Sequence, residues 1–287
     1  MYLTRFTLPP VGVQEQFIND EKRTCYKSFY PFGVFGPREM PSFTFAPITI
    51  FYGGNGSGKS TILNVMAEKL RLRRGAAYNR SAFFGAYVDL CDAELDRRCL
   101  ALPQDSRIVT SDDVFDYLLN IRGFNEGVDR RRDDVFDEYL TAKYSSFQLR
   151  GMEDYEELKR HVDARRMTQS RFVRSRLAEN VQERSNGESA LAFFTETVQE
   201  NALYLLDEPE NSLSAPRQLE LRQFLADSAR FYGCQLVIAT HSPFLLSLPQ
   251  ARIYDLDAED VPVRPWTDLE NVRTYRAFFQ EHEGEFD

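Results

Sequence analysis

Hydrophobic positions change their spacing several times along the 287-residue chain, and each change predicts a different element. Short apolar and β-branched runs at 43–45 and 48–52 predict strands. The apolar positions of 61–70 follow a helical stripe. Continuous apolar runs at 202–206 and 235–239 predict parallel strands that are buried on both faces. We therefore expect an α/β protein with a mostly parallel central sheet and an N-terminal antiparallel β element.

The C-terminal part of the chain continues this alternation. A helix predicted at 216–232 joins the last two strands into a βαβ unit. A further strand is predicted at 252–256. Thr267 and Glu270 have the spacing of a capping box, which predicts a final helix running through Phe279.

The middle of the chain has a different pattern, because no proline occurs between Gln104 and Glu208. Stretches with helical periodicity and dense charge lie at 112–120, 135–149 and 155–183. They predict a helical insertion into one composite domain. The expected division is 1–103 for the N-terminal half of the core, 104–184 for the insertion and 185–287 for the C-terminal half.

A glycine-rich loop lies between the strand at 48–52 and the helix that follows it, and it fits the pattern G-x-x-x-x-G-K-[ST]. Glycines let the backbone N–H groups of such a loop wrap around phosphate groups, at the positive end of the helix dipole. Lys59 is expected to reach the β- and γ-phosphates of a nucleotide, and the Ser60 hydroxyl to bind Mg²⁺. The predicted nucleotide-binding residues are Gly53, Gly54, Asn55, Gly56, Ser57, Gly58, Lys59, Ser60 and Thr61.

Two acids follow the buried strand at 202–206. Successive strand residues point to opposite sides, so Asp207 is expected to face the metal and Glu208 the water that attacks the γ-phosphate. Unpaired acids at the end of a buried strand are costly unless a cation lies nearby. The sequence thus predicts a site that binds ATP and Mg²⁺, with Lys59 and Glu208 among its catalytic residues.

Three further segments resemble motifs of the ABC ATPase superfamily, in the order that this superfamily has them. The segment 185–189 (SNGES) resembles the signature motif, 208–214 resembles the stretch from the second acid into the D-loop, and 239–243 (ATHSP) resembles the switch-histidine motif. The resemblance implies a head-to-tail, ATP-dependent homodimer in which the signature of one copy closes over ATP held by the other. The signature residues that would act in trans are Ser185, Asn186, Gly187 and Glu188, and His241 would bind the γ-phosphate.

The residues after the histidine favour one branch of the superfamily. The sequence His241-Ser242-Pro243 is similar to the SMC-like, non-transport ATPases, whereas transporter subunits usually have Asp after the histidine. Nearly the whole chain, including 30–32, 207–213 and 251–256, resembles small, standalone bacterial proteins of AAA/ABC type described as predicted ATPases. The resemblance implies an ATP hydrolase acting as a switch in a nucleic-acid-related or defence process. The alternatives are the ATP-binding subunit of a membrane transporter, and a nucleotide-binding regulator with negligible turnover, against which the pair of acids argues.

The chain departs from the superfamily pattern in places. Ser214 stands where the D-loop usually ends in Asp, and Asn186 where the signature usually has Gly. No glutamine marks the Q-loop, so Ser111 and Asp112 are taken as its equivalent. The aromatic residues that could stack on adenine are Tyr30, Phe32, Phe43 and Phe45.

Composition limits the classes of partner and compartment. A formal net charge of −9 argues against a protein that coats nucleic acid through a basic surface. No apolar run approaches a membrane span, the N-terminus lacks the pattern of a secretory signal, and the four cysteines lack the spacing of a zinc site. We expect a soluble, cytoplasmic protein with reduced cysteines and no membrane insertion.

Two basic runs interrupt this acidic composition. They comprise Lys69, Arg71, Arg73, Arg74 and Arg80, and then Lys159, Arg160, Arg165, Arg166, Arg171, Arg174 and Arg176. Arginine forks suit phosphate groups, so either run could contact nucleic acid. Solvated helix faces balanced by neighbouring acids are the other interpretation, and a nucleic-acid or defence-related protein partner stays open.

Overall fold

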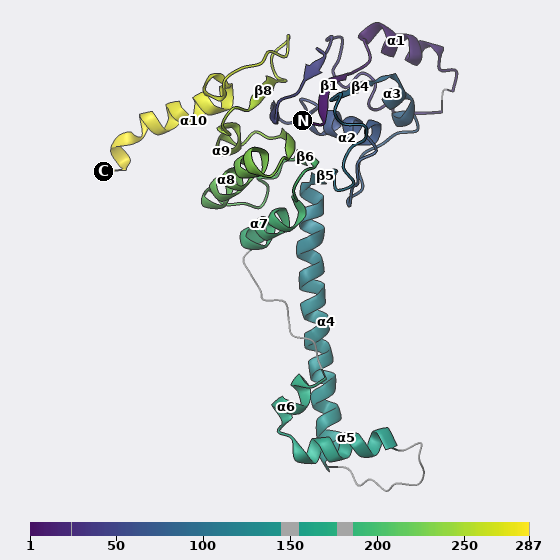
Figure 1. Ribbon diagram of the computed structural model, residues 1–287, viewed down its shortest axis with the longest axis vertical. Coiled ribbons are helices and arrows are strands. Elements are labelled where there is room, and N and C mark those ends of the chain that lie inside the picture. Colours follow the sequence, from purple (N-terminus) through teal and green to yellow (C-terminus); the bar gives the residue numbers. More distant parts are fainter. Residues whose placement is uncertain (24, 145–154, 177–185, 287) are drawn as a thin grey trace. The chain divides into compact units, whose positions relative to one another are not determined.

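The structure is a computed structural model that describes residues 1–23, 25–144, 155–176 and 186–286 (Figure 1). The chain forms two compact units. The first comprises Met1–Phe115 with Asn186–Asp287, and the second comprises Asp116–Ser185. None of the described helices is long and apolar enough to cross a lipid bilayer.

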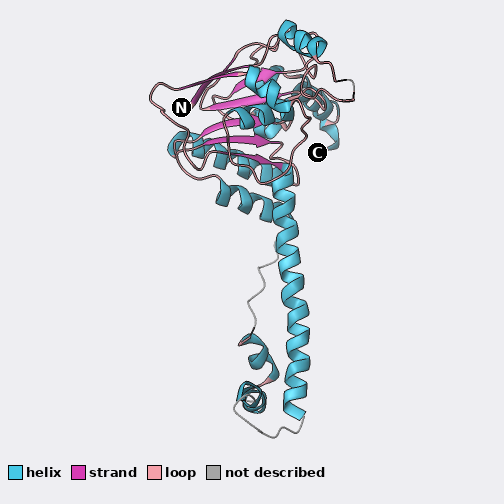
Figure 2. Cartoon of the chain, turned by 90° about the vertical axis from the view of Figure 1, so that its right-hand side faces the viewer, coloured by secondary structure: helices cyan, strands magenta, loops and turns pink. Residues whose placement is uncertain are grey.

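A five-stranded parallel sheet forms the centre of the first unit (Figure 2). Its order is β5 (Arg107–Thr110), β6 (Leu203–Asp207), β7 (Gln235–Ala239), β3 (Ile48–Tyr52) and β8 (Arg252–Asp255). All five residues of β3 and of β7 are buried, as their continuous apolar runs predict. The predicted α/β class and the four predicted strands of this sheet are confirmed. The fifth strand, β5, lies within the range 104–184, which was expected to be mostly helical.

The helices of the first unit connect these strands. They are α1 (Val11–Asp20), α2 (Lys59–Lys69), α3 (Phe84–Leu90), α7 (Asn186–Thr197), α8 (Ala215–Phe231), α9 (Pro243–Leu246) and α10 (Glu270–Glu281), with short 3-10 turns η2 (Trp266–Asp268) and η3 (Glu283–Glu285). The helix α8 joins β6 to β7, which confirms the predicted βαβ unit. The capping-box prediction is wrong: Thr267 lies in η2, and α10 begins after Leu269 without a side-chain cap.

A small antiparallel sheet with the order β2 (Phe43–Thr44), β1 (Leu3–Thr7) and β4 (Asp92–Leu95) packs beside the central sheet. Aromatic rings join the two sheets, since the Phe43 ring lies 4.9 Å from that of Phe51 and 5.0 Å from that of Tyr254. The buried Gln235 side chain of β7 also links them, accepting from the Leu3 N–H at 2.8 Å and donating to the Leu3 carbonyl at 2.7 Å. The expected N-terminal antiparallel element is confirmed.

The second unit is helical. The 34-residue α4 (Ser111–Tyr144) begins in the first unit and continues into the second, which also contains α5 (Tyr155–Arg166) and α6 (Gln169–Arg174). Its core contains Val135, Tyr139, Ala142, Ala164, Phe172 and Val173. The stretches 112–120 and 135–144 are therefore parts of one helix rather than two, while 145–149 and 177–183 lie outside the described residues.

Candidate active site

The glycine-rich loop connects β3 to α2 at the carboxyl end of the central sheet. Gly56 and Gly58 have positive φ angles of 83° and 94°, which side chains other than glycine rarely adopt. A Cβ atom at Gly58 would also collide with the ring of Phe35. The loop therefore needs glycine at Gly58 for two separate reasons, and only the first could be predicted from the motif.

Lys59 places its ammonium group over this loop. Its side chain is 4% exposed, and Nζ donates to the carbonyl oxygens of Gly53 at 2.7 Å and Gly54 at 2.9 Å. The Glu208 carboxylate lies 3.9 Å from the same nitrogen. A buried ammonium at the N-terminal end of a helix makes a site that attracts a polyanion.

Ser60 and Asp207 bring two oxygen ligands together. Ser60 lies in the first turn of α2, Asp207 is the last residue of β6, and Ser60 Oγ donates to Asp207 Oδ1 at 3.0 Å. The pKa of the Asp207 carboxyl is raised to about 6, mainly by burial and also by the Glu208 charge, while the Ser60 hydrogen bond and the Lys59 charge act in the opposite direction. A hydroxyl and a carboxylate at this spacing fit Mg²⁺, which prefers oxygen ligands.

This pair would share a metal ion with other oxygens. Within the described ranges, no group of three or more His, Cys, Asp and Glu side chains is arranged to hold a metal ion. Mg²⁺ commonly binds one or two protein oxygens and completes its shell with phosphate oxygens and water. The residues present therefore fit a magnesium ion that arrives with a nucleotide.

Glu208 lies outside the strand, in a conformation that differs from the one expected. Its φ angle is +48°, in the left-handed region that is uncommon for residues with a side chain, and its N–H donates to the Ala239 carbonyl at 2.9 Å. Oε2 accepts a hydrogen bond from Asn211 Nδ2 at 3.1 Å. The two acids are therefore separated by a turn of the backbone and not by strand alternation. Such conformations concentrate at functional sites.

His241 follows β7, whose last residue Ala239 lies in register with Asp207. The His241 N–H donates to Glu210 Oε1 at 3.1 Å, and the His241 carbonyl accepts from Asn271 Nδ2 at 2.9 Å. Its ring is 44% exposed, and Nδ1 lies 3.9 Å from Glu208 Oε1. The sheet order therefore brings the predicted switch histidine beside the predicted catalytic acid.

The signature residues lie at the start of α7. This helix begins at Asn186, and the Glu188 carboxylate pairs with Arg217 Nη2 of α8 at 2.8 Å. A Cβ atom at Gly187 would lie 3.6 Å from the Ser212 carbonyl, so the segment lies beside the D-loop of the same chain. Ser185 lies outside the described residues. A role of this segment in trans stays a prediction.

The Q-loop candidates Ser111 and Asp112 lie where β5 passes into α4. Thr110 is in register with Asp207 on the neighbouring strand, which places this junction beside the expected metal ligand. The side chain that fixes the junction is that of Asp113, whose Oδ2 accepts from the Thr110 N–H at 2.7 Å. Sequence reasoning did not single out Asp113, although an Asp in the first turn of a helix is a common signal.

The four aromatic candidates for adenine stacking separate by burial. Phe32, Phe43 and Phe45 are buried in the hydrophobic core. Tyr30 is half-buried, and its hydroxyl lies 3.1 Å from Oγ1 of Thr61, the last residue of the phosphate loop. Of the four, Tyr30 is therefore the one with a direct contact to the loop.

Three further residues of the site were not expected from the sequence. Glu210 and Asn271 hold the backbone of His241, and both oxygens of Asp257 accept from the Gly54 N–H, at 3.0 and 2.8 Å. A pocket of about 400 Å³ lies here, lined by Tyr52, Gly53, Gly54, Asn55, His241, Glu270, Asn271 and Thr274. Only Glu210 had a signal, its position two residues after Glu208; the others reach the site through the fold.

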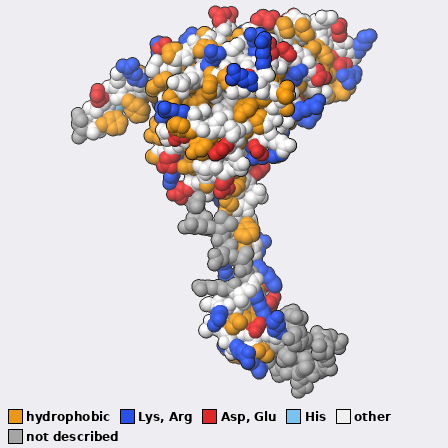
Figure 3. All heavy atoms as spheres, in the orientation of Figure 1, with side chains coloured by type: hydrophobic (Ala, Val, Ile, Leu, Met, Phe, Trp, Pro, Cys, Tyr) orange, Lys and Arg blue, Asp and Glu red, His pale blue; other side chains and the backbone are white. Residues whose placement is uncertain are grey.

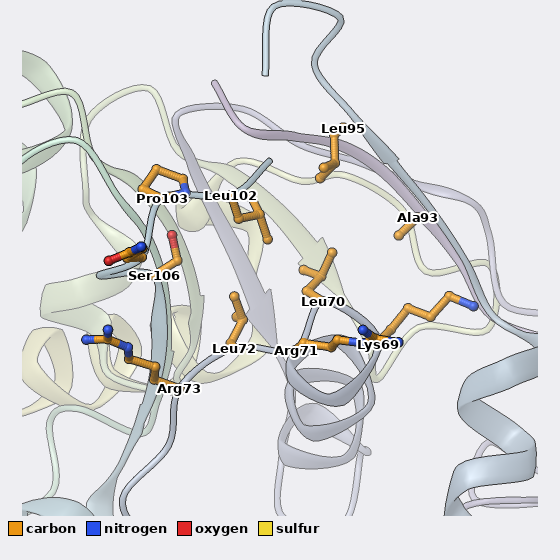
Figure 4. A pocket seen from close by; sticks show the side chains of 11 residues that line it. Lys69, Leu70, Arg71, Leu72, Arg73, Ala93, Leu95, Leu102, Pro103 and Ser106 are labelled. Atoms are coloured by element: carbon orange, nitrogen blue, oxygen red, sulfur yellow. The ribbon is translucent and has the colours of Figure 1, made fainter. Parts of the chain in front are cut away.

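The first basic run does not form one surface. Arg74 donates to Asn64 Oδ1 at 2.5 Å, its guanidinium lies 3.6 Å from the Tyr78 ring centroid, and burial lowers its pKa. Figure 4 shows Lys69 and Arg73 extending away from each other beside a leucine-lined pocket of about 560 Å³. That pocket lies at the C-terminal end of α2, about 15 Å from the phosphate loop by helix length, so it is separate from the candidate active site.

The family model described as "AAA domain, putative AbiEii toxin, Type IV TA system" matches residues 93–247. The matched range contains Asp207, Glu208 and His241, and the phosphate loop precedes it. No curated protein matches the sequence.

The chain also matches solved structures at low identity. One is the Smc head domain of Pyrococcus furiosus, with an extended coiled coil and bound to the C-terminal domain of ScpA: its TM-score is 0.46, with 12% identity over 98% of this chain and 99% of that chain. Another is a nucleotide-free ATP-binding cassette from an ABC transporter, with a TM-score of 0.42 and 11% identity over 96% of each chain. The SMC head domain of Thermotoga maritima has a TM-score of 0.37 and 12% identity over 92% of this chain and 99% of that chain.

Proposed function

The chain belongs to the AAA-domain family whose model it matches over more than half its length, and from this premise we propose that it binds Mg-ATP and hydrolyses the γ-phosphate bond. The observation that carries the proposal is the convergence of one cation and three polar groups from separate segments. Lys59, Asp207, Glu208 and His241 come from α2, the end of β6, and the residues after β6 and β7.

Each of these residues has a distinct role in the proposed reaction. The Lys59 ammonium binds the β- and γ-phosphate oxygens and offsets their charge. Ser60 and Asp207 hold Mg²⁺, which neutralises negative charge on the phosphates when it is bound. Glu208 orients the attacking water and accepts its proton, and His241 donates a hydrogen bond to the γ-phosphate.

Tyr30 is the residue that we assign to the adenine base. Its contact with Thr61 places the ring at the end of the phosphate loop, while the other candidate rings are buried. Aromatic stacking on a base is sequence-tolerant and adds affinity without fixing the rest of the nucleotide.

We place hydrolysis at the interface of a head-to-tail homodimer that holds ATP between its two copies. At the start of the signature segment, the Glu188 carboxylate pairs with Arg217, and Gly187 lies beside Ser212 of the D-loop segment. The described helix α7 begins at this point, and a positive helix-dipole end is where the γ-phosphate of a second copy would bind in this proposal. Binding of ATP would then assemble the dimer and hydrolysis would release it.

The proposed biological role is a switch in a nucleic-acid-related or defence process. The family description names an AbiEii toxin and a type IV toxin–antitoxin system, which supports a defence role for this chain. The second basic run supports a nucleic-acid partner. Within the described residues, Arg165, Arg166 and Arg171 are exposed and have no carboxylate partner.

The segment 155–176, which contains α5 and α6, differs in charge from the rest of the chain. Between residues 155 and 176, seven residues are Lys or Arg and three are Asp or Glu, although the whole chain carries −9. Figure 3 shows Lys and Arg side chains gathered on the unit that contains α5 and α6. The side chains of Arg160 and Arg174 lie outside the described part, and Arg176 pairs with Asp163 at 3.5 Å.

Release of phosphate from ATP by the purified chain tests the chemical proposal. The chain should release phosphate in the presence of Mg²⁺, and Glu208→Gln should release it at least about 100-fold more slowly. Equal rates for the two proteins would contradict the assignment of Glu208. The transporter alternative predicts instead that the chain co-purifies with a membrane protein, and the absence of stimulation by DNA or RNA would favour it.

A further inference from the structure

A second buried acid, Glu210, follows Glu208 in the turn after β6, and the proposed chemistry gives it no role. We propose that Glu210 is a positioning residue that fixes the backbone and ring of His241 for contact with the γ-phosphate. This inference rests on the proposed function, since it concerns how the switch histidine is oriented. It is carried by the contacts of the two carboxylate oxygens.

The first oxygen of Glu210 binds two consecutive residues of the switch segment, the residues 239–243 that contain His241. Oε1 accepts from Thr240 Oγ1 at 2.6 Å and from the His241 N–H at 3.1 Å, and it lies 3.6 Å from His241 Nδ1. Hydrogen bonds to a charged group are stronger than those between neutral groups. One oxygen thus fixes the backbone of His241 and lies nearest to one nitrogen of its ring, which leaves Nε2 to face another group.

The second oxygen points to a functional rather than a structural use of this acid. Glu210 is 5% exposed, and within the described part of the chain its Oε2 is buried without a hydrogen-bond partner. A buried carboxylate oxygen with no partner costs free energy that an apolar residue would avoid. The acid is therefore kept at a cost, and its other oxygen lies 3.6 Å from His241 Nδ1, which fits a use in holding the histidine.

The switch segment is tied to the D-loop by the same group of contacts. Thr240 Oγ1 accepts from the Ser242 N–H at 3.0 Å, and Ser242 Oγ lies 2.6 Å from Gln218 Oε1. Gln218 Nε2 in turn donates to the Leu213 carbonyl at 2.9 Å. Glu210 therefore holds Thr240, and Gln218 of α8 holds Ser242 while it also contacts Leu213. A movement of the D-loop segment would reach His241 through both of its neighbours.

Ring NMR of the nucleotide-free chain tests the positioning directly. The chain has three histidines, and His241→Ala identifies the signals of His241. Glu210→Gln keeps the Oε1 acceptor and the side-chain shape but removes the charge. It should move the ¹⁵N signals of the His241 ring and leave those of His282, whose ring contacts Glu285, unchanged. Unmoved His241 signals in a folded variant would overturn the proposal.

Kinetics separate positioning from direct catalysis. Glu210→Gln should lower kcat about 10- to 100-fold, the range for residues that orient a functional histidine, with ATP affinity changed less than about twofold. In a His241→Ala background the same substitution should lower kcat no further. An equal additional loss there would show that Glu210 acts independently of His241 and would reject the inference.

Two more variants keep the test decisive. Thr240→Val removes one donor to Glu210 while conserving shape, and should give a smaller loss of kcat that also vanishes in the His241→Ala background. It replaces Glu210→Gln if that variant does not fold. Glu200→Gln, an exposed acid seven residues before Asp207, is the matched control and should match the parent chain in every measurement. Failure of the proposed function differs visibly, because the parent chain would then not hydrolyse ATP.

Discussion

Ser60 Oγ donates a hydrogen bond to Asp207 Oδ1 at 3.0 Å, which joins the first turn of α2 to the end of β6. The two residues are 147 positions apart in the sequence. Both residues are the proposed oxygen ligands for Mg²⁺. The Ser60 hydrogen bond lowers the pKa of a carboxyl that burial raises.

The raised pKa of Asp207 predicts a pH-dependent stability. Its pKa is about 6 in the folded chain, whereas the ordinary pKa of an Asp side chain is 3.8, so folding favours the protonated form. The stabilisation is present below about pH 4 and is lost as the pH rises through about 6. Asp207→Asn should therefore raise the melting temperature at pH 7.5 without nucleotide, and this advantage should shrink toward pH 4.5.

Thermal melting with and without Mg-ATP checks both parts of this prediction. Mg-ATP should raise the melting temperature of the parent chain and have little effect on Asp207→Asn, because a bound ligand stabilises only the state that binds it. Asp260→Asn, at an exposed acid, is the control and should behave as the parent does. A destabilised Asp207→Asn at every pH would show that the carboxylate supports the fold instead.

Lys59→Ala should remove nucleotide binding. The variant loses a buried ammonium that lies over the loop, and ATP affinity is expected to fall about 100-fold or more. Lys69→Ala, at the other end of the same helix, is the matched control and should bind ATP as the parent does. Calorimetric titration of ATP measures both, and normal affinity in Lys59→Ala would remove the assignment of the phosphate loop.

The contiguous motifs of this site were predictable, and the contacts between them were predictable only in part. Glycines, Lys59 and Ser60 lie in one short pattern with a strand before it and a helix after it. Strand order follows from the parallel βαβ arrangement, which brings the ends of β6 and β7 to one edge. The turn at Glu208 was not predictable, because alternation along a strand does not indicate where the strand ends.

Residues that reach the site from distant segments had no local signal. Asn271 lies 30 positions after His241, in a helix whose start was wrongly predicted from a capping box. The length of α4 was also missed, because helical periodicity was identified only at 112–120 and 135–149 and not between them. In the structure, Arg130 pairs with Glu126 at 3.5 Å and Arg131 with Glu138 at 3.1 Å, so helical ion pairs fill that stretch.

Glu208→Gln should trap an ATP-bound homodimer. The substitution removes the base while Lys59 and the metal ligands remain, so ATP binds but its hydrolysis slows about 100- to 10,000-fold. Light scattering after size-exclusion chromatography should give a monomer without nucleotide and a dimer with Mg-ATP. A monomer that carries ATP would contradict the proposed sandwich while leaving nucleotide binding intact.

Tyr30→Ala should weaken nucleotide binding without slowing the bound reaction. Loss of one stacking ring corresponds to an affinity loss of about tenfold, whereas Tyr30→Phe keeps the ring and loses only the contact with Thr61. The measurement is KM against kcat for the three proteins. A fall in kcat with constant KM would place Tyr30 elsewhere, and Phe84→Leu, in the core beside Tyr30, controls for altered packing.

The exposed arginines of α5 and α6 predict a salt-sensitive interaction with nucleic acid. The triple variant Arg165→Gln, Arg166→Gln and Arg171→Gln should bind DNA or RNA more weakly and lose its stimulation of ATP hydrolysis. The slope of log affinity against log salt should fall by about 0.9 for each duplex phosphate contact that is lost.

The matched control for this test is the triple variant of Arg130, Arg131 and Arg132, which removes the same charge from the same unit. Each of these arginines is already paired with an acid of α4, so its replacement should change the salt slope little. Fluorescence anisotropy over a salt series measures both variants. An equal loss of nucleic-acid affinity in the two triple variants would show that the effect depends on net charge alone. If neither the parent chain nor the control variant binds nucleic acid, then nucleic acid is not the partner of α5 and α6.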